Sequence, residues 1–338
     1  MTLRLRRVTT CIAALAVAAV PLLGSAQIAA ATGSSDHQQP RQRAGGYVAM
    51  GDSYSSGEGT GIYTRGTNSS TNQCHRSPLA YGPLISATTR NLGRFSFVAC
   101  SSATTASLYV ANAGRAPQLD ALRPRTKLVT LTIGGNDAVF GTVAKACVES
   151  ARTPGRFGCS KNPQLNGVID ARLAELAGTS AGSGAVVPVK KILTDIAAKS
   201  PRANIYLAGY PELFGNRRAQ FSVDQSAPSG RSCVVNPSFA GRVDFTDTQF
   251  INTRTQQLNA VLRTAVQQAK AAGVKATFVP VGTFEGHGLC DAKASWIQPV
   301  LANSAAVIQP ESLHPTRVGQ SRGYFRAFQD AGVGASKN

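Results

Sequence analysis

A serine that directly follows a short apolar segment is the first residue in this sequence that could do chemistry. Ser53 stands in Gly51-Asp52-Ser53-Tyr54, immediately after Val48 to Met50, and in an open parallel sheet such strand ends face the ligand crevice. A serine hydroxyl is a poor nucleophile near neutral pH, so it needs a nearby base and donors for the oxyanion that it generates. We therefore predict that Ser53 is a nucleophile and that its base is a histidine.

The candidate bases are the four histidines His37, His75, His287 and His314. His37 lies in a polar tail, and His75 stands beside a cysteine in a segment rich in glycine, serine and asparagine. The serious candidates are therefore His287 and His314.

Five sequence blocks occur in a fixed order along the chain. They are Gly51-Asp52-Ser53-Tyr54-Ser55-Ser56-Gly57, Val98-Ala99-Cys100-Ser101-Ser102-Ala103-Thr104, Gly134-Gly135-Asn136-Asp137, Gly286-His287-Gly288-Leu289-Cys290 and Glu311-Ser312-Leu313-His314-Pro315. With these blocks the chain resembles the SGNH (GDSL) hydrolase family over roughly residues 46–330, and in particular its secreted actinobacterial lipases and esterases.

The resemblance implies roles for four residues. Ser53 would be the nucleophile and His314 the base. The oxyanion hole would consist of the backbone N–H of Ser53, a backbone N–H at Ser102 and the side-chain amide of Asn136. The family usually has glycine where this chain has Ser102, but serine keeps the main-chain donor unless the position requires a positive φ.

The group that orients His314 has two alternatives. The family usually has an aspartate where this chain has Glu311, and a glutamate can also orient an imidazole and stabilise its charged form. Its longer side chain can miss the ring, however, and some relatives use a main-chain carbonyl before the histidine instead. We expect a structural role for His287, and we expect Asp52 and Asp137 to hold the strand-end turns by hydrogen bonds.

Residues 1–31 have the pattern of a secretory signal peptide, with arginines near the start, an apolar stretch and then small residues. The apolar stretch is shorter than the roughly 20 residues that a membrane-spanning helix needs, so a signal anchor is the weaker alternative. Residues 32–45 are polar and are expected to be a flexible N-terminal segment. The protein is therefore predicted to be secreted.

Cysteine usage agrees with export. Six cysteines follow the predicted signal peptide, and an even number in an exported protein favours disulfides. Sequential pairing is the simplest arrangement and would give Cys74–Cys100, Cys147–Cys159 and Cys233–Cys290. Zinc is the rival interpretation, but the cysteines form no CxxC pair and have no histidine at ligand spacing, so we expect no metal.

Short β-rich segments alternate with longer stretches of helical pattern. The predicted strands are 47–50, 95–99, 128–133, 204–208 and 276–281. This alternation predicts a parallel sheet between layers of helices. It agrees with the α/β fold that the resemblance implies, a three-layer α/β/α sandwich with a five-stranded, mainly parallel sheet.

The clearest helix is predicted at 248–271, with Thr246 or Asp247 as its cap. Its apolar residues follow a helical stripe and are expected to lie in the core: Leu258, Val261, Leu262, Ala265, Val266 and Ala269. Residues 214–245 show no sustained period and are predicted to form a long loop that shapes the cleft. Nothing divides residues 46–335, which are predicted to form one SGNH hydrolase domain.

The charge of the chain is strongly basic, with a formal net charge of +18 in 338 residues. Such a charge favours anionic partners, among them a lipid interface or an anionic membrane. The basic residues are scattered and lack the interleaved aromatic residues of single-strand binders, so we expect no nucleic-acid partner. We also expect a monomer.

These patterns together predict a secreted serine esterase or lipase that hydrolyses lipid or short-to-medium acyl esters through an acyl-enzyme, with no cofactor. Phospholipase A-type hydrolysis and deacetylation of polysaccharides are the enzymatic alternatives. A basic extracellular module that binds polyanions is the non-enzymatic alternative, and the complete set of Ser53, Asn136 and His314 argues against it.

Overall fold

A five-stranded parallel sheet forms the centre of the computed structural model, which describes residues 46–111, 115–150, 158–182, 184–236, 241–303 and 307–334. Its strands are β1 (Gly46–Gly51), β2 (Arg94–Phe97), β3 (Thr126–Thr132), β4 (Asn204–Ala208) and β8 (Ala276–Val279). They lie in the order β2-β1-β3-β4-β8, and every neighbouring pair is parallel. The predicted sheet is confirmed. The predicted signal peptide (1–31) and N-terminal segment (32–45) lie outside the described residues.

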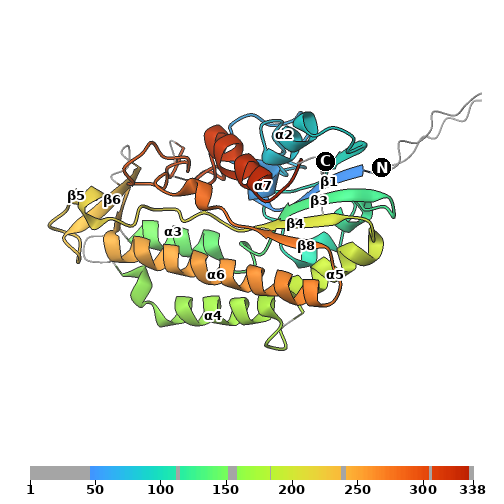
Figure 1. Ribbon diagram of the computed structural model, residues 1–338. Helices are drawn as coiled ribbons and strands as arrows, with labels where there is room; N and C mark the ends of the chain where they lie inside the picture. The colour runs from blue at the N-terminus through green and yellow to red at the C-terminus, as the bar shows by residue number, and fades with distance from the viewer. Residues whose placement is uncertain are drawn as a thin grey trace, which may run out of the picture. The chain divides into compact units, whose positions relative to one another are not determined.

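Helices cover both faces of this sheet, with α2 and α7 on one side and α3 to α6 on the other (Figure 1). The helices are α1 (Ser53–Ser56), α2 (Tyr81–Thr88), α3 (Phe140–Ser150), α4 (Pro163–Ala177), α5 (Val189–Lys199), α6 (Phe245–Ala271) and α7 (Arg326–Asp330). The predicted three-layer α/β/α sandwich is therefore confirmed.

The core lies between these layers. β1 and β3 are buried along nearly their whole length, as expected for strands covered by helices on both faces. On α6, Leu258, Leu262, Ala265 and Ala269 of the predicted stripe are buried, and the helix packs against β8 of the sheet. The helical spacing of these residues therefore predicted correctly which face of α6 is buried.

The start of α6 differs from the prediction. The helix begins at Phe245, and its cap is Asp244, whose carboxylate accepts a hydrogen bond from the Thr246 N–H at 2.7 Å. The prediction that Thr246 or Asp247 caps the helix is wrong, because Asp247 already lies in the first turn. Its carboxylate instead accepts hydrogen bonds from Ser160 and from the Gly158 N–H at 2.9 Å.

The predicted loop at 214–245 also needs correction. It contains a small antiparallel sheet of β5 (Ser222–Val223), β6 (Arg231–Asn236) and β7 (Gly241–Asp244). Strands as short as β5 leave no periodic pattern, since pairing with β6 defines them rather than their own sequence.

All three predicted disulfides are present, with S–S distances of 2.01 Å for Cys74–Cys100, 1.97 Å for Cys147–Cys159 and 2.02 Å for Cys233–Cys290. Within the described ranges, none of the helices combines the length and the apolar character that crossing a membrane requires.

Candidate active site

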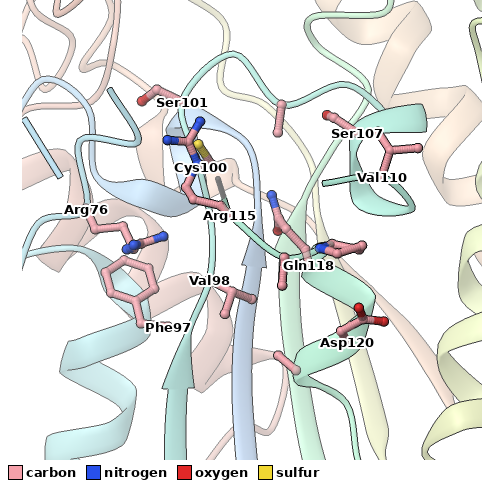
Figure 2. Close-up of a pocket in the computed structure, with 14 residues that line it drawn as sticks. Arg76, Phe97, Val98, Cys100, Ser101, Ser107, Val110, Arg115, Gln118 and Asp120 are labelled. Atoms are coloured by element: carbon pink, nitrogen blue, oxygen red, sulfur yellow. The ribbon is translucent and has the colours of Figure 1, made fainter. Parts of the chain in front are cut away.

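The turn after β1 places Ser53 at the carboxyl edge of the sheet. Gly51 ends the strand with a φ of 116°, and a Cβ atom there would lie 2.1 Å from the Thr132 carbonyl oxygen, so only glycine fits. Gln118, which Figure 2 shows beside β1, accepts a hydrogen bond from the Gly51 N–H at 2.7 Å and donates one to its carbonyl at 2.9 Å. Ser53 then opens the short helix α1.

Asp52 holds this turn, as predicted. Its carboxylate caps α1 by accepting from the Tyr54 N–H at 3.0 Å, and it also accepts from the hydroxyls of Thr132, at 2.6 Å, and Tyr210. Burial raises the pKa of Asp52 to about 6, even though these hydrogen bonds favour the charged form. The second predicted turn residue, Asp137, similarly accepts from the backbone N–H and hydroxyl of Thr105.

His314 meets Ser53 across the cleft. Its Nε2 lies 2.8 Å from the Ser53 Oγ, and its Nδ1 lies 3.0 Å from the carbonyl oxygen of Ser312. With Nδ1–H donating to that carbonyl, Nε2 is left to accept the serine proton. Burial lowers the pKa of His314, which favours the neutral imidazole that a general base requires.

Of the two groups that could orient His314, the main-chain carbonyl is the one that lies within hydrogen-bond distance of the imidazole. Leu313 has a left-handed φ of 62°, and the chain reverses there so that the Ser312 carbonyl faces the ring. The Glu311 carboxylate accepts a hydrogen bond from the Tyr63 hydroxyl at 3.4 Å, and among the described residues it makes none with His314. Of the two alternatives, the contacts therefore favour the main-chain carbonyl over the Glu311 carboxylate.

The three predicted oxyanion donors lie on segments that are tied together. Asn136 donates one amide hydrogen to the Ala103 carbonyl at 2.9 Å, which leaves its second hydrogen available in the cleft. Ser102 precedes Ala103 and has a φ of 63°, the left-handed conformation for which the family's glycine is suited. Its N–H has no acceptor among the described residues, and the N–H of Ser53 begins a helix and points out of it.

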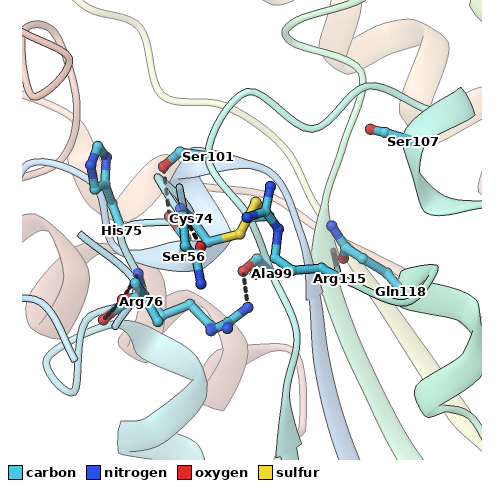
Figure 3. Close-up of a disulfide and its surroundings, with 12 residues drawn as sticks. Ser56, Cys74, His75, Arg76, Ala99, Ser101, Ser107, Arg115 and Gln118 are labelled. Atoms are coloured by element: carbon cyan, nitrogen blue, oxygen red, sulfur yellow. Dashed lines mark hydrogen bonds between the residues drawn. A yellow bond between two sulfur atoms is a disulfide. The ribbon is translucent and has the colours of Figure 1, made fainter. Parts of the chain in front are cut away.

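Glu58 is a buried carboxylate near His314 that was not predicted from the sequence. Glu58 is 1% exposed and accepts hydrogen bonds from His75 at 2.7 Å, from the Ser101 hydroxyl and from the Tyr63 hydroxyl at 3.3 Å. The Cys74–Cys100 disulfide brings the segments carrying His75 and Ser101 together (Figure 3).

Glu58 also acts on the base electrostatically. Burial alone would raise the pKa of Glu58, but the hydrogen bond from His75 and the charge of His314 outweigh it, so the pKa is lowered. In return, the Glu58 charge raises the pKa of His314 against the effect of burial. Glu58 directly follows the first sequence block, but nothing in its spacing shows that it faces His75 or His314.

A cleft of about 570 Å³ opens in front of Ser53, Asn136 and His314, within the range of small-molecule sites. Its walls are largely apolar and include Phe140, Ala144, Leu213, Val300, Val307, Ile308 and Leu313. The catalytic candidates therefore face a cleft that suits an aliphatic chain.

Comparison with known proteins agrees with this geometry. Residues 49–322 match the GDSL-like Lipase/Acylhydrolase family. A lipase of Streptomyces rimosus is 31% identical over 329 residues, which cover 96% of this chain and 98% of that lipase. The chain belongs to the GDSL-like lipase/acylhydrolase family. It is a carboxylic ester hydrolase.

Other proteins of Streptomyces match this chain along most of their own length. Lipase 1 of Streptomyces coelicolor is 32% identical, over 90% of this chain and 93% of that protein. The crystal structure of phospholipase A1 from Streptomyces albidoflavus NA297 has a TM-score of 0.59 and 29% identity, and covers 85% of this chain and 99% of its own. That of the extracellular lipase from Streptomyces rimosus has a TM-score of 0.57 and 28% identity, with coverages of 85% and 100%.

The remaining family-like histidine, His287, lies away from the cleft of this GDSL-like hydrolase. Its ring stacks on Trp296 with centroids 3.6 Å apart, and its Nδ1 lies 2.8 Å from the Ala294 carbonyl oxygen. It is not among the residues that line the cleft. These contacts are structural, as the sequence suggested.

Proposed function

We propose that the protein is a secreted lipase or esterase that hydrolyses lipid or short-to-medium acyl esters through a Ser53–His314 acyl-enzyme. The observation that carries the proposal is the 2.8 Å contact between the Ser53 Oγ and the His314 Nε2 at the edge of an apolar cleft. All groups of this site come from one chain, so the proposed reaction needs no residue of a second subunit.

The reaction has two steps. Ser53 Oγ attacks the ester carbonyl carbon while His314 Nε2 takes its proton, and His314 then gives this proton to the departing alcohol oxygen as the C–O bond breaks. A water molecule next attacks the acyl-serine while His314 takes its proton. The acid leaves, and Ser53 regains its hydrogen.

Three donors stabilise the oxyanion in both steps. They are the backbone N–H groups of Ser53 and Ser102 and the free amide hydrogen of Asn136. Removal of one such donor typically costs about 3 kcal/mol of transition-state stabilisation.

Two further groups support the imidazolium that forms in each step. The Ser312 carbonyl fixes the tautomer and plane of the His314 ring, and the Glu58 carboxylate supplies the nearby negative charge. The Glu311 carboxylate also raises the pKa of His314, but its effect is smaller than those of Glu58 and the Ser312 carbonyl.

The apolar walls of the cleft favour an aliphatic acyl group. Phospholipase A-type hydrolysis is the second candidate, because the charge of +18 favours anionic interfaces and a similar crystal structure is that of a phospholipase A1. Secretion is supported by the three disulfides and by the similar extracellular lipase from Streptomyces rimosus.

A series of p-nitrophenyl esters of increasing acyl length tests this function. The purified protein should hydrolyse the series, and Ser53→Ala and His314→Ala should each lower kcat by about 10⁴-fold or more. Gln309 lines the cleft but is not part of the proposed machinery, so Gln309→Ala serves as a cleft variant that should retain turnover. Wild-type rates in Ser53→Ala would overturn the proposal.

A further inference from the structure

A second cavity, of about 380 Å³, lies beside the oxyanion segment. Two arginines, Arg76 and Arg115, line it, and we call it the arginine cavity. Figure 2 shows the Arg115 guanidinium near Cys100 and that of Arg76 beside the Phe97 ring, whereas Asp120, the acidic residue of the lining, lies at the opposite wall. Most of the remaining lining is apolar and includes Phe97, Val98, Val110 and Pro117.

The two guanidinium groups have few partners in the protein. Arg76 donates to the Ala99 carbonyl at 3.3 Å (Figure 3), and Arg115 donates to the Thr71 carbonyl at 3.4 Å. Each guanidinium has five N–H donors, and neither forms an ion pair with a carboxylate of the described residues. Most of their donors are therefore available to a ligand.

The arginines also repel one another. Burial lowers the pKa of Arg76, and the charge of Arg115 lowers it further. Two like charges at the edge of one cavity are unfavourable in the protein alone, and an anion between them would remove this cost. Among the described residues no carboxylate pairs with either guanidinium, so this position is open to an anionic ligand.

The chemistry of the lining selects the anion. Guanidinium groups match the oxygens of a phosphate in a bidentate manner, and the apolar walls suit an organic substituent on that phosphate. We propose that the arginine cavity binds an organic phosphate ester, with a phospholipid headgroup as its source. The phosphate site is inferred from the residues of the cavity, whereas the phospholipid headgroup as its source rests on the proposed ester hydrolase function.

The arginine cavity and the ester cleft have no lining residue in common, but hydrogen bonds connect the segments around them. Ala103 lines the cavity, and its carbonyl holds the Asn136 amide. Gln118 lines it as well and binds both backbone groups of Gly51. A phosphate in this cavity would therefore lie against segments that position the oxyanion donors.

Calorimetric titration with glycerol 3-phosphate, inorganic phosphate and glycerol tests the binding site. Wild type should bind glycerol 3-phosphate more tightly than inorganic phosphate and should not bind glycerol. Arg115→Gln and Arg76→Gln should each weaken binding about tenfold or more. Arg90→Gln, which removes an exposed arginine elsewhere, should bind as wild type does.

Kinetics then identify the source of the phosphate. Arg115→Gln should lower kcat/KM on dispersed phospholipid about tenfold and change that on p-nitrophenyl butyrate less than about twofold. Glycerol 3-phosphate binding that depends on the arginines, with unchanged phospholipid hydrolysis, would overturn the headgroup as the source.

Equal binding of glycerol 3-phosphate by wild type and Arg115→Gln would overturn the site itself. If Arg76→Gln fails to fold because it loses its bond to Ala99, Arg115→Gln still decides. Failure of the proposed function would appear separately, as absence of p-nitrophenyl ester hydrolysis in wild type, and the calorimetric result would stand apart from it.

Discussion

At the scale of single residues, the base depends on charges from segments far apart in the chain. Burial lowers the pKa of His314, while Glu58 and Glu311 both raise it. A lower pKa keeps the imidazole neutral to lower pH but makes the imidazolium of the transition state harder to form. The balance between burial and these two carboxylates therefore sets both the acid limit and the rate.

Glu58→Gln should show this balance in the pH profile of kcat/KM. The profile rises as pH passes through the pKa of His314, because the neutral imidazole is the active form. Removal of the Glu58 charge lowers this pKa further, so the acid limb should move to lower pH, with kcat reduced about tenfold. Glu311→Gln is the matched control and should move the limb less. Equal shifts in the two variants would contradict the role given to Glu58.

Asn136→Ala should lower kcat on p-nitrophenyl esters by about 10²-fold or more with little change in KM, because the donor acts on the oxyanion. Ser102→Gly is the matched change on the other oxyanion segment. It keeps the main-chain N–H and suits the φ of 63°, so activity should persist and thermal stability should not fall. Wild-type kcat in Asn136→Ala would remove that residue from the oxyanion hole.

At the scale of elements, close packing of loops fixes the position of the base. Gly59 has a φ of 89°, and a Cβ atom there would lie 2.8 Å from the His314 Cβ and 2.7 Å from the Pro315 carbonyl oxygen. Gly61 has a φ of 71°, but a Cβ atom there would meet nothing within 4 Å. The two glycines share a left-handed backbone and differ in their contact with the base.

Gly59→Ala and Gly61→Ala are therefore a matched pair. Both should lose about 1 kcal/mol of unfolding free energy to backbone strain, measured by denaturant titration. Only Gly59→Ala should also push His314 away from Ser53 and lower kcat, by about 10²-fold for a displacement near 1 Å. An equal effect of the two substitutions on kcat would show that contact with His314 is unimportant.

Much of the fold could be predicted from the sequence because its signals are local. The parallel sheet follows from buried strands that alternate with helical stretches, and the α6 stripe gives its inward face. The small β5–β6–β7 sheet could not be predicted, since strands of two to six residues are defined by pairing across the turn and by the Cys233–Cys290 bond.

The candidate site also has one part that could be predicted from the sequence and another that could not. Ser53, Asn136 and His314 stand in blocks whose order is visible in the sequence, and the structure gathers them in one cleft. The Ser312 carbonyl carries no side-chain signal, so only backbone geometry could favour it over Glu311. Glu58, in the turn after α1, contacts His75, which stands beside the Cys74–Cys100 disulfide, and this contact depends on tertiary structure that no local pattern reveals.

At the scale of the whole molecule, the charge of +18 should affect how the protein reaches its substrate. Association with vesicles that contain an anionic phospholipid should be measurable by co-sedimentation at low salt. It should weaken strongly as ionic strength rises from about 0.01 to 1 M, where the Debye length falls from about 30 to 3 Å. Vesicles of zwitterionic phospholipid alone are the control, and equal, salt-independent binding to both would argue against charge-driven access.

Covalent trapping of the nucleophile tests the central claim most directly. The purified protein is treated with a fluorophosphonate ester and digested, and the site of modification is located by mass spectrometry. We predict one adduct, on Ser53, that is absent in Ser53→Ala and forms far more slowly in His314→Ala. An adduct on another residue, or no adduct in a preparation that hydrolyses p-nitrophenyl esters, would contradict the account.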